Sequence, residues 1–337
     1  MKAMILTAGL GTRLRPLTLE RAKPSIPLLG KPLVVRLLEK LASQGATEFR
    51  LNLHHLPASI EKLFLTEGEN KLNVSFSHEP RILGTAGGLK ANESFFQDGT
   101  FLMVNGDIVM EFPLEEALAF HRERKALATL ILFPQPEPAR YFPVHVDRDG
   151  RFLNFKGISE IGVARPDTYV FTGVHILEPK IFRYIPDGEF FEINDQVYPQ
   201  TIKNGEKVLG FPVEGYWNDV GDPVRYLEAQ RDLLSVNIPG QDGKLRQMSG
   251  RRFSPGAAIS ESAEFGPCAS AGPGSVIEAG STIQNSILWE NVHVKAGASV
   301  VNCIVSSGVT LEGEVRNLIV TGYGKSPIVD TKVSKAF

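Results

Sequence analysis

The sequence predicts an α/β protein with a doubly wound, mostly parallel sheet, followed by a short β-helix. Strand-like and helix-like segments alternate through the first 135 residues, and a six-residue hydrophobic repeat begins at Ile259. Such alternation is typical of parallel strands joined by right-handed crossovers. A six-residue repeat is typical of short strands stacked in coils. A chain of 337 residues can hold two domains, which we predict at residues 1–240 and 251–337.

Each element of the first part is predicted from its periodicity and its flanking residues. Strands are expected where short apolar or alternating runs end at turn residues, over 4–7, 49–54, 72–77, 101–104 and 127–133. Helices are expected where apolar residues recur three or four positions apart, over 32–41, 58–65, 113–125 and 223–234. Ligands of such sheets bind beyond the carboxyl ends of the strands, so the segments after Thr7, Ser77 and Val104 should share one edge.

The repeat in the C-terminal part has regularly spaced apolar anchors. They are six residues apart except for two steps of five, at Ile259, Phe265, Ala271, Ile277, Ile283, Leu288, Val294, Val300, Val305 and Leu311. A small residue follows five of these ten anchors by four positions, at Ala263, Ala269, Ser275, Ser281 and Ala298. We predict that the anchors point inward and that the small residues fit tight corners. A β-sandwich is the alternative, but the repeat is too long for chance alternation. Residues 241–250, polar and rich in glycine, are predicted as a linker.

The composition argues against several classes of protein. With 42% apolar and 22% charged residues and a net charge of -2, the chain has no long basic stretch that would suggest a nucleic-acid groove. The sequence holds no run of about 18 apolar residues, so we predict no membrane span. The apolar run at residues 3–6 is too short for a secretory signal. Cys268 and Cys303 cannot alone hold a structural zinc ion, so we predict two small core residues in a cytoplasmic protein.

The most informative segment follows the first predicted strand. Residues 9–18 read Gly-Leu-Gly-Thr-Arg-Leu-Arg-Pro-Leu-Thr, and Lys23-Pro24 comes shortly after; we call residues 9–24 the signature segment. Glycines after a strand let backbone N–H groups approach phosphates. Arg13 would supply a forked donor set and Lys23 a mobile point charge. A lone Gly-x-Gly would usually be a turn, and the segment is neither a P-loop nor a dinucleotide fingerprint, because Leu14 replaces the third glycine.

Two carboxylates and a second glycine-rich segment add to this chemistry. Residues 79–88 begin with Glu79-Pro80 and contain three glycines, which suggests a glycine-rich loop before the next helix. Asp107 follows a buried strand and Gly106, and beside the other motifs we favour metal ligation over a turn cap for it. Asp219 lies in a predicted loop at residues 217–221. Mg²⁺ takes one or two carboxylates together with phosphate oxygens, so two aspartates suffice.

At these motifs the sequence resembles the sugar-1-phosphate nucleotidyltransferases, also called NDP-sugar pyrophosphorylases. Their opening motif, Gly-x-Gly-Thr-Arg-x-x-Pro-Leu-Thr followed by Lys-Pro, is matched in full, and the resemblance covers roughly residues 1–235. It implies a Rossmann-like catalytic domain followed by a β-helix of the left-handed form. It also implies that the protein makes an NDP-sugar and pyrophosphate from a nucleoside triphosphate and a sugar 1-phosphate, with Mg²⁺ as cofactor.

The resemblance further implies roles for individual residues. Arg13 and Lys23 would hold the nucleotide's phosphates, and Asp107 and Asp219 would bind Mg²⁺, so these four are the expected catalytic residues. Sugar binding is expected at Gly173, Asn194 and Lys156. Nucleotide binding is expected at the signature residues and at the edges of the neighbouring strands, namely Ala8, Gly9, Gly11, Thr12, Arg13, Lys23, Glu79, Gly84, Thr85 and Gly106.

Two departures from the family pattern leave the sugar open. Asn194 stands where an acidic residue is usual, and Glu192 or Asp195 could substitute for it. The Phe-x-Glu-Lys-Pro motif, whose Lys contacts the sugar phosphate, is missing. Lys156, Arg165 or the metal ion are therefore the candidates for that contact.

The specific interpretation is a mannose-1-phosphate guanylyltransferase-like enzyme that uses GTP and mannose 1-phosphate. A uridylyl- or thymidylyltransferase acting on glucose 1-phosphate or another sugar phosphate is the alternative. A catalytically silent, NDP-sugar-binding regulatory subunit is disfavoured because the chain keeps all four charged catalytic residues. An acyltransferase is disfavoured because His293 is the only histidine of the short tail. We expect the tail to provide homo-oligomer contacts or to support a lid.

Overall fold

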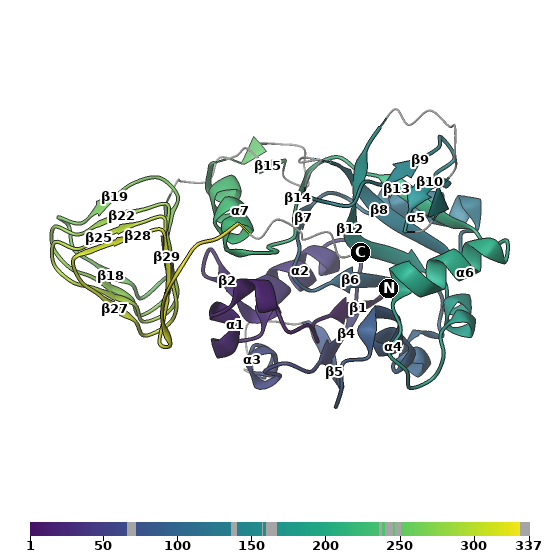
Figure 1. Cartoon of the computed structure of the whole chain (residues 1–337), viewed down its shortest axis with the longest axis horizontal. Helices are drawn as coiled ribbons and strands as arrows, with labels where there is room; N and C mark the ends of the chain where they lie inside the picture. Colours follow the sequence, from purple (N-terminus) through teal and green to yellow (C-terminus); the bar gives the residue numbers. More distant parts are fainter. Residues whose placement is uncertain are drawn as a thin grey trace. The chain divides into compact units, whose positions relative to one another are not determined.

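The structure is a computed structural model that describes residues 1–65, 72–135, 140–156, 167–235 and 251–330, together with the short strands at 158–159, 238–239 and 245–246 (Figure 1). These residues group by contact into two compact units. The first comprises Met1–Gly9 and Leu37–Trp217, and the second comprises Leu10–Arg36 and the described part of Asn218–Ser334. Most of the predicted linker at 241–250 lies outside the described residues. The domain division at 1–240 and 251–337 stays a prediction.

A seven-stranded sheet forms the centre of the first unit, in the order β13-β8-β12-β6-β1-β4-β5 (Figure 1). Only β12 runs antiparallel to both of its neighbours in this sheet. The mostly parallel sheet predicted from the sequence is therefore confirmed. The strands are β1 (Lys2–Leu6), β4 (Glu48–Leu53), β5 (Asn73–His78), β6 (Phe101–Asn105), β8 (Ala128–Pro134), β12 (Tyr169–Leu177) and β13 (Val208–Pro212).

Helices and short strands complete this part of the chain. The predicted helices are present as α2 (Leu33–Ala42), α3 (Ala58–Glu61) and α5 (Glu115–Arg124), but α3 ends four residues before its predicted end at 65. Others are α4 (Gly84–Lys90), α6 (Tyr198–Lys203), the 3₁₀ helices at Glu93–Phe96 and Pro179–Tyr184, and a π-helical turn at Ile193–Val197. The short strands are β7 (Val109–Glu111), β9 (His145–Val146), β10 (Phe152–Phe155), β11 (Ile158–Ser159) and β14 (Tyr216–Asn218). The predicted loop at 217–221 thus begins as a strand.

Helix α4 corrects the prediction of a glycine-rich loop at this place. Glycine is a poor helix former, which is why the sequence suggests a loop. The glycines are nevertheless required, because a Cβ atom at Gly87 would lie 2.4 Å from the carbonyl oxygen of Glu189. A Cβ atom at Gly88 would lie 2.5 Å from Oε1 of Glu79. Close packing against other segments therefore stabilises a helix that its own residues disfavour.

The core of the first unit joins the sheet to α4 and α6. Met4 of β1, Met103 of β6 and Leu130 of β8 belong to one buried cluster with Leu89 of α4 and Tyr198 of α6. Each of these side chains is fully buried. Burying one large apolar side chain contributes about 1.5–3 kcal/mol. This packing fixes the strand ends that carry the predicted site residues.

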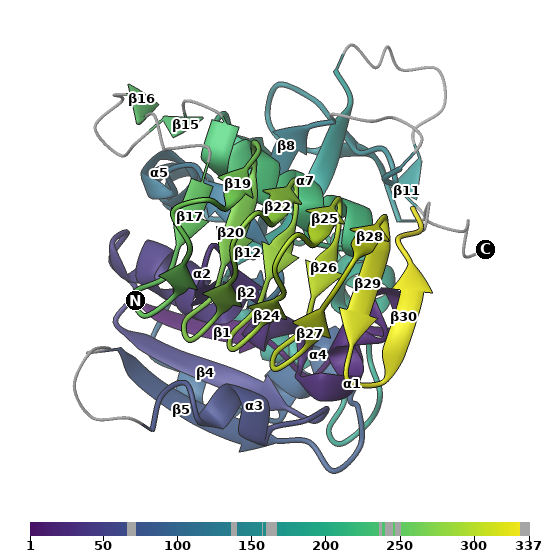
Figure 2. The same cartoon turned by 90° about the vertical axis from the view of Figure 1, so that its left-hand side faces the viewer.

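The second unit contains the β-helix (Figure 2). Its parallel strands form sheets in the orders β17-β20-β23-β26-β29-β30, β18-β21-β24-β27 and β19-β22-β25-β28, with only the last pair, β29 and β30, antiparallel. The coils of the helix are 18, 17 or 15 residues long, as the pairings Ile259↔Ile277, Ile277↔Val294 and Ile304↔Ile319 show. Three sides of about six residues make each coil. The predicted left-handed β-helix is confirmed.

The strands of the β-helix are short and follow one another at nearly constant spacing. They are β17 (Arg251–Phe253), β18 (Ala258–Ile259), β19 (Glu264–Phe265), β20 (Ala269–Ala271), β21 (Val276–Ile277), β22 (Thr282–Gln284), β23 (Ile287–Leu288), β24 (His293–Val294), β25 (Ser299–Val301), β26 (Ile304–Val305), β27 (Thr310–Leu311), β28 (Glu314–Arg316), β29 (Leu318–Thr321) and β30 (Gly324–Pro327). The predicted anchors form its apolar core, in which Ile283 and Val300 are fully buried. Cys268 and Cys303 are free and buried, as predicted.

The second unit also contains the signature segment from Leu10 onward. This stretch forms the 3₁₀ helices Thr12–Leu14 and Lys23–Ser25, α1 (Leu17–Glu20), β2 (Pro27–Leu28) and β3 (Lys31–Pro32). Further along the chain, α7 (Pro223–Ser235) confirms the helix predicted at 223–234, and β15 (Ile238–Pro239) pairs with β16 (Leu245–Arg246).

Candidate active site

In the first unit, the segments that follow β1, β4 and β5 are tied together by a buried carboxylate. The backbone N–H of Thr7 donates to Oδ1 of Asn52 at 2.7 Å, and Nδ2 of Asn52 donates to Oε1 of Glu79 at 2.8 Å. The other oxygen of Glu79 accepts the backbone N–H of Leu83 at 3.1 Å. Because Glu79 is only 4% exposed, its carboxylate serves as an internal tie at this edge. Its contact with a nucleotide stays a prediction.

Gly106 brings the segment after β6 to the same edge. Its backbone N–H donates to the carbonyl oxygen of Leu6 at 2.9 Å. A Cβ atom at Gly106 would lie 2.7 Å from Cγ2 of Thr7, so no larger residue fits here. Asp107 follows directly and is half-buried, while Ala8 is 6% exposed on the adjoining segment. The structure therefore brings these predicted nucleotide and metal residues to the carboxyl ends of β1 and β6, as expected.

Gly173 lies beside the strand end that carries Asp107. The register pairs Val174 of β12 with Val104 of β6, which places Gly173 next to Asn105. Gly173 has a φ of +85°, and a Cβ atom there would lie 2.6 Å from Nδ2 of Asn105. Both the backbone conformation and the close approach therefore require glycine.

Gly84 and Thr85 begin helix α4 and contact the segment around Glu192. A Cβ atom at Gly84 would lie 2.6 Å from the carbonyl oxygen of Phe191. The hydroxyl of Thr85 donates to Oε2 of Glu192 at 2.6 Å and accepts the backbone N–H of Ile193 at 2.8 Å. Glu192, a candidate sugar ligand by sequence, is thus already held by Thr85.

The remaining sugar-side residues meet at the π-helical turn Ile193–Val197. Nζ of Lys156 lies 3.0 Å from Oδ1 of Asp195, so the structure brings Lys156 to the turn that contains Asn194. Oδ1 of Asn194 is shielded from solvent and has no hydrogen-bond partner among the described residues. π-Helical turns are frequent at functional sites, and the sequence carried no signal for this one. Arg165, the other candidate for the sugar phosphate, lies outside the described residues.

In the second unit, the signature segment is folded tightly around Gly11. Gly11 has a φ of +61°, and its carbonyl oxygen accepts the hydroxyl of Thr18 at 2.9 Å. A Cβ atom at Gly11 would lie 2.8 Å from Cγ2 of Thr18 and 3.1 Å from Cβ of Lys23. Thr12 and Arg13 open the 3₁₀ helix that follows and are exposed.

Lys23 differs from its prediction as a mobile point charge. It is only 7% exposed, because it packs behind Gly11 at the start of the 3₁₀ helix Lys23–Ser25. Burying a charged side chain costs free energy, and a buried side chain has few positions open to it. The position of Lys23 therefore depends on what fixes the segment around it.

Asp219 and Arg13 approach each other at Gly221. A Cβ atom at Gly221 would lie 3.0 Å from Oδ2 of Asp219 and 3.3 Å from Nη1 of Arg13. A side chain at this position would therefore push on both groups. The structure therefore brings the predicted phosphate-binding cation and a predicted metal ligand to the same glycine within one unit.

Arg225 is a residue of this site that no sequence motif marks. Its Nε donates to Oδ1 of Asp219 at 3.3 Å, and its Nη1 donates to Oε2 of Glu228 at 3.2 Å. Arg225 is 7% exposed. It lies six residues after Asp219, across the junction of a loop and helix α7, so helical spacing rules do not reveal the pair.

The described residues contain no cluster of three or more His, Cys, Asp or Glu side chains that could hold a metal ion. Asp107 belongs to the first unit and Asp219 to the second. Carboxylate oxygens are nevertheless the ligands that Mg²⁺ prefers, and substrate phosphates supply further oxygens. Each aspartate therefore has the chemistry of a magnesium ligand, and their shared binding of one ion stays a prediction.

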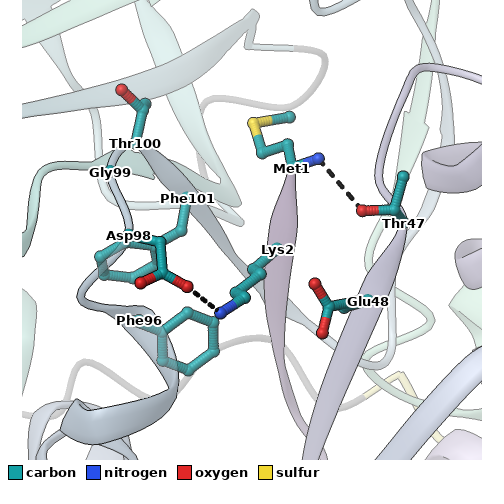
Figure 3. Close-up of a pocket in the computed structure, with 9 residues that line it drawn as sticks. All are labelled: Met1, Lys2, Thr47, Glu48, Phe96, Asp98, Gly99, Thr100 and Phe101. Atoms are coloured by element: carbon teal, nitrogen blue, oxygen red, sulfur yellow. Dashed lines mark hydrogen bonds and ion pairs between the residues drawn. The ribbon is translucent and has the colours of Figure 1, made fainter.

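A cavity of about 240 Å³ opens elsewhere on the first unit, at the amino ends of β1, β4 and β6 (Figure 3). Its lining includes Glu48, Phe101 and Lys2, and Nζ of Lys2 bonds to Oδ2 of Asp98 at 2.5 Å. Substrates of such sheets bind beyond the carboxyl ends of the strands. The cavity therefore lies at the edge of the sheet opposite to the predicted nucleotide site.

Comparison with known proteins identifies the family. A family model described as nucleotidyl transferase matches residues 2–236. The chain belongs to this family. Enzymes of the family generally use a divalent metal ion. None of the helices in the described ranges is both long and apolar enough to span a membrane.

Individual relatives cover most of this nucleotidyltransferase. It is 31% identical to a UTP–glucose-1-phosphate uridylyltransferase of Synechocystis, with 90% of this chain and 87% of that protein aligned. It is 29% identical to a mannose-1-phosphate guanylyltransferase of Mycobacterium tuberculosis, with 88% and 82% aligned. The crystal structure of HddC from Yersinia pseudotuberculosis matches with a TM-score of 0.57 at 25% identity, over 68% of this chain and 97% of that one. The fold and the family predicted from the sequence are thus confirmed.

Proposed function

We propose that the protein transfers a nucleotidyl group from a nucleoside triphosphate to a sugar 1-phosphate and releases pyrophosphate. GTP and mannose 1-phosphate are the preferred pair. The observation that carries this proposal is the convergence of Arg13 and Asp219 on Gly221, in a chain matched by the nucleotidyltransferase family over residues 2–236. It supports the proposal because Arg13 would donate to the triphosphate and the carboxylate of Asp219 would suit a metal ion. A silent binding subunit has no need to keep both charges.

The reaction needs positioning more than acid–base chemistry. The sugar phosphate is already an anionic nucleophile at neutral pH, so it requires no strong general base. The barriers are the repulsion between two polyanions and the growth of charge on the departing pyrophosphate. Fixed cations and aligned reactants lower both barriers. In the proposal, Arg13 donates to the triphosphate oxygens and the buried Lys23 provides a second cation at a defined place.

Asp107 and Asp219 are the proposed ligands of Mg²⁺, which when bound neutralises phosphate charge and polarises the α-phosphate. Gly106 supports this role for Asp107 because its close contact with Thr7 fixes the backbone just before the aspartate. Arg225 supports the role of Asp219 by donating to its Oδ1, and Oδ2 of Asp219 lies toward Gly221. Such partners orient metal ligands and tune their affinity.

The sugar is proposed to bind along Gly173, Asn194 and Lys156. Oδ1 of Asn194 lacks a hydrogen-bond partner among the described residues, and a sugar hydroxyl would satisfy it as donor. Lys156 is the proposed cation for the sugar phosphate and would exchange its ion pair with Asp195 for that contact. The proposal places the protein in the cytoplasm, with homo-oligomer contacts through the β-helix and without nucleic acid or membrane as partner.

The test is pyrophosphate release with Mg²⁺ across a matrix of GTP, UTP, dTTP, CTP and ATP against mannose-, glucose-, N-acetylglucosamine- and heptose 1-phosphates. The relatives' names point to two cells of this matrix. Guanylyl transfer to mannose 1-phosphate is the expected preference, and uridylyl transfer to glucose 1-phosphate is the main competitor. Another preferred pair would replace the substrates and keep the mechanism. Release from no pair, with an NDP-sugar still bound, would identify a regulatory subunit instead.

A further inference from the structure

Residues of the β-helix bind the stretch of chain that carries Lys23 through hydrogen bonds and an ion pair. We define the Lys23 segment as residues 17–28, which comprises α1, the 3₁₀ helix at Lys23–Ser25 and β2. This segment and the β-helix both belong to the second unit. Hydrogen bonds join α1 and α7 to the β-helix, and a further one joins α7 to β2. The residues of the Lys23 segment that make these contacts lie both before and after Lys23 in the sequence.

Arg21 makes the strongest of these contacts. Its Nη1 and Nη2 donate to Oε1 and Oε2 of Glu290 at 3.2 and 2.9 Å, and its Nη2 also donates to Oγ of Ser307 at 2.8 Å. The guanidinium carbon lies 4.5 Å from the centre of the Trp289 ring, as in a cation–π contact. A forked ion pair fixes orientation as well as distance. Arg21, with a side chain only 16% exposed, is thus held from two directions, two residues before Lys23.

Glu290 is prepared to stay ionised in this position. Burial raises its pKa, but the hydrogen bonds from Arg21 and Ser307 outweigh burial and hold the pKa below its ordinary value. Oγ of Ser307 donates to Oε2 of Glu290 at 2.6 Å. The carboxylate of Glu290 therefore stays charged throughout the neutral pH range. We call the contacts of Arg21 with Glu290 and Ser307 the clamp.

Contacts on either side extend the clamp. Oε1 of Glu20 accepts Oγ of Ser306 at 2.8 Å and the backbone N–H of Gly322 at 3.1 Å. On the other side of Lys23, the hydroxyl of Tyr226 donates to the carbonyl oxygen of Pro27. The Lys23 segment is therefore fixed by the β-helix before the lysine and by helix α7 after it.

Helix α7 is itself mounted on the same face of the β-helix. Nε1 of Trp289 donates to the hydroxyl of Tyr226 at 3.1 Å. The amide of Gln230 donates to the carbonyl oxygens of Cys268 and Ser286 at 2.8 and 3.0 Å and accepts Oγ of Ser270 at 2.5 Å. These residues lie in or beside β20 and β23, in the six-stranded sheet. One face of the β-helix thus holds both the Lys23 segment and the helix that carries Arg225.

We propose that Glu290 and Ser307 of the β-helix are positioning residues for nucleotidyl transfer, which set the place of Lys23 through their grip on Arg21. The β-helix is then part of the working enzyme and not only a surface for oligomer contacts. This inference rests on the proposed function of Lys23 as a phosphate-binding cation. A displacement of about 1 Å at such a group costs on the order of a hundredfold in rate.

The test compares Glu290→Gln with a matched control in the full-length protein. Glu290→Gln places an amide donor where Arg21 and Ser307 both donate. Glu278→Gln is the control, because Glu278 is also a β-helix carboxylate with several partners, accepting from Ala296 at 2.9 Å and contacting His293, but it lies on another sheet. Ser307→Ala is the milder second variant, which removes one hydroxyl from the clamp and leaves the ion pair.

The readouts are kcat and KM for the nucleoside triphosphate, thermal stability, and amide hydrogen exchange of peptides covering residues 17–28. Glu290→Gln should lower kcat/KM roughly ten- to a hundredfold and raise exchange in the Lys23 segment, with Ser307→Ala in between. Glu278→Gln should stay within about twofold of the wild type in kcat/KM. The loss of kcat/KM and the rise in exchange should appear at a temperature at which the thermal unfolding curves show that the variants and the wild type are equally folded.

The outcomes separate this inference from the proposed function. If the wild type is active and Glu290→Gln matches Glu278→Gln in kcat/KM and in exchange, the positioning role is wrong. If the wild type releases pyrophosphate from no substrate pair, the proposed function fails. In that case exchange in the Lys23 segment still decides whether the clamp holds it, since unchanged exchange in Glu290→Gln would overturn the clamp.

Discussion

Acid pH should destabilise the protein through a buried histidine next to the sugar-side residues. His175 in β12 is 1% exposed, and its Nδ1 is hydrogen-bonded to the hydroxyl of Tyr198 at 2.6 Å. Burial lowers the pKa of His175 from 6.5 to about 3. Tyr198 begins α6, directly after the π-helical turn that contains Asn194. This histidine therefore couples the protonation of the protein to the packing beneath the proposed sugar site.

The expected magnitude follows from the difference in protonation between the two states. Between pH 6.5 and the folded pKa of about 3, the unfolded chain binds a proton at His175 and the folded chain does not. The free energy of unfolding therefore falls by about 1.4 kcal/mol for each unit of pH below 6.5, or about 2 kcal/mol at pH 5. His121, whose pKa is also lowered by burial, acts in the same direction.

Urea denaturation at pH 7 and pH 5 measures this loss, and the variant His175→Gln isolates it. Glutamine can keep a hydrogen bond to Tyr198 but cannot take up the proton. We expect the loss between the two pH values to be about 2 kcal/mol smaller in His175→Gln than in the wild type. His78→Gln is the control, because the side chain of His78 is 60% exposed. An equal loss in His175→Gln and the wild type would refute a buried neutral His175.

Three further predictions concern the site itself. Asp107→Asn should lower pyrophosphate release by about a thousandfold or more at saturating substrates with an unchanged circular dichroism spectrum, and near-normal turnover would contradict a metal-binding role. Gly173→Ala should cost about 1–3 kcal/mol of stability in urea denaturation, because its Cβ would lie 2.6 Å from the Asn105 amide at a φ of +85°. Arg225→Lys should raise the Mg²⁺ concentration needed for half-maximal rate roughly tenfold, since lysine lacks the Nε donor to Asp219. An unchanged Mg²⁺ requirement would mean that Arg225 does not orient this ligand.

The β-helix is a part of the fold that could be predicted from local sequence alone. Its coils could be predicted because each side uses the same six-residue unit, with an apolar anchor such as Ile283 and a small corner residue such as Ser281. The parallel strands of the first unit were likewise predictable from short apolar runs. The tight turn at Gly11, with its φ of +61°, follows from the absence of a side chain. In each case neighbouring residues carry the whole signal.

The parts that were missed depend on residues far apart in the sequence. Helix α4 forms against the local preference of its glycines, because Gly87 fits closely against Glu189. Lys23 is buried rather than mobile, since it packs behind Gly11. Neither packing arrangement leaves a periodic trace in the chain.

The sequence by itself determined the fold class, the coil repeat, the family and the chemical types of the site residues. These features reside in local periodicity and in short motifs, where backbone preference and side-chain chemistry act over a few residues. Only the tertiary structure decided which partner each charged group has. Arg225 donates to Asp219, and Arg21 donates to Glu290 from 269 residues away. Such pairs are selected by packing, burial and the need to neutralise charge in the folded chain, so no local pattern can specify them.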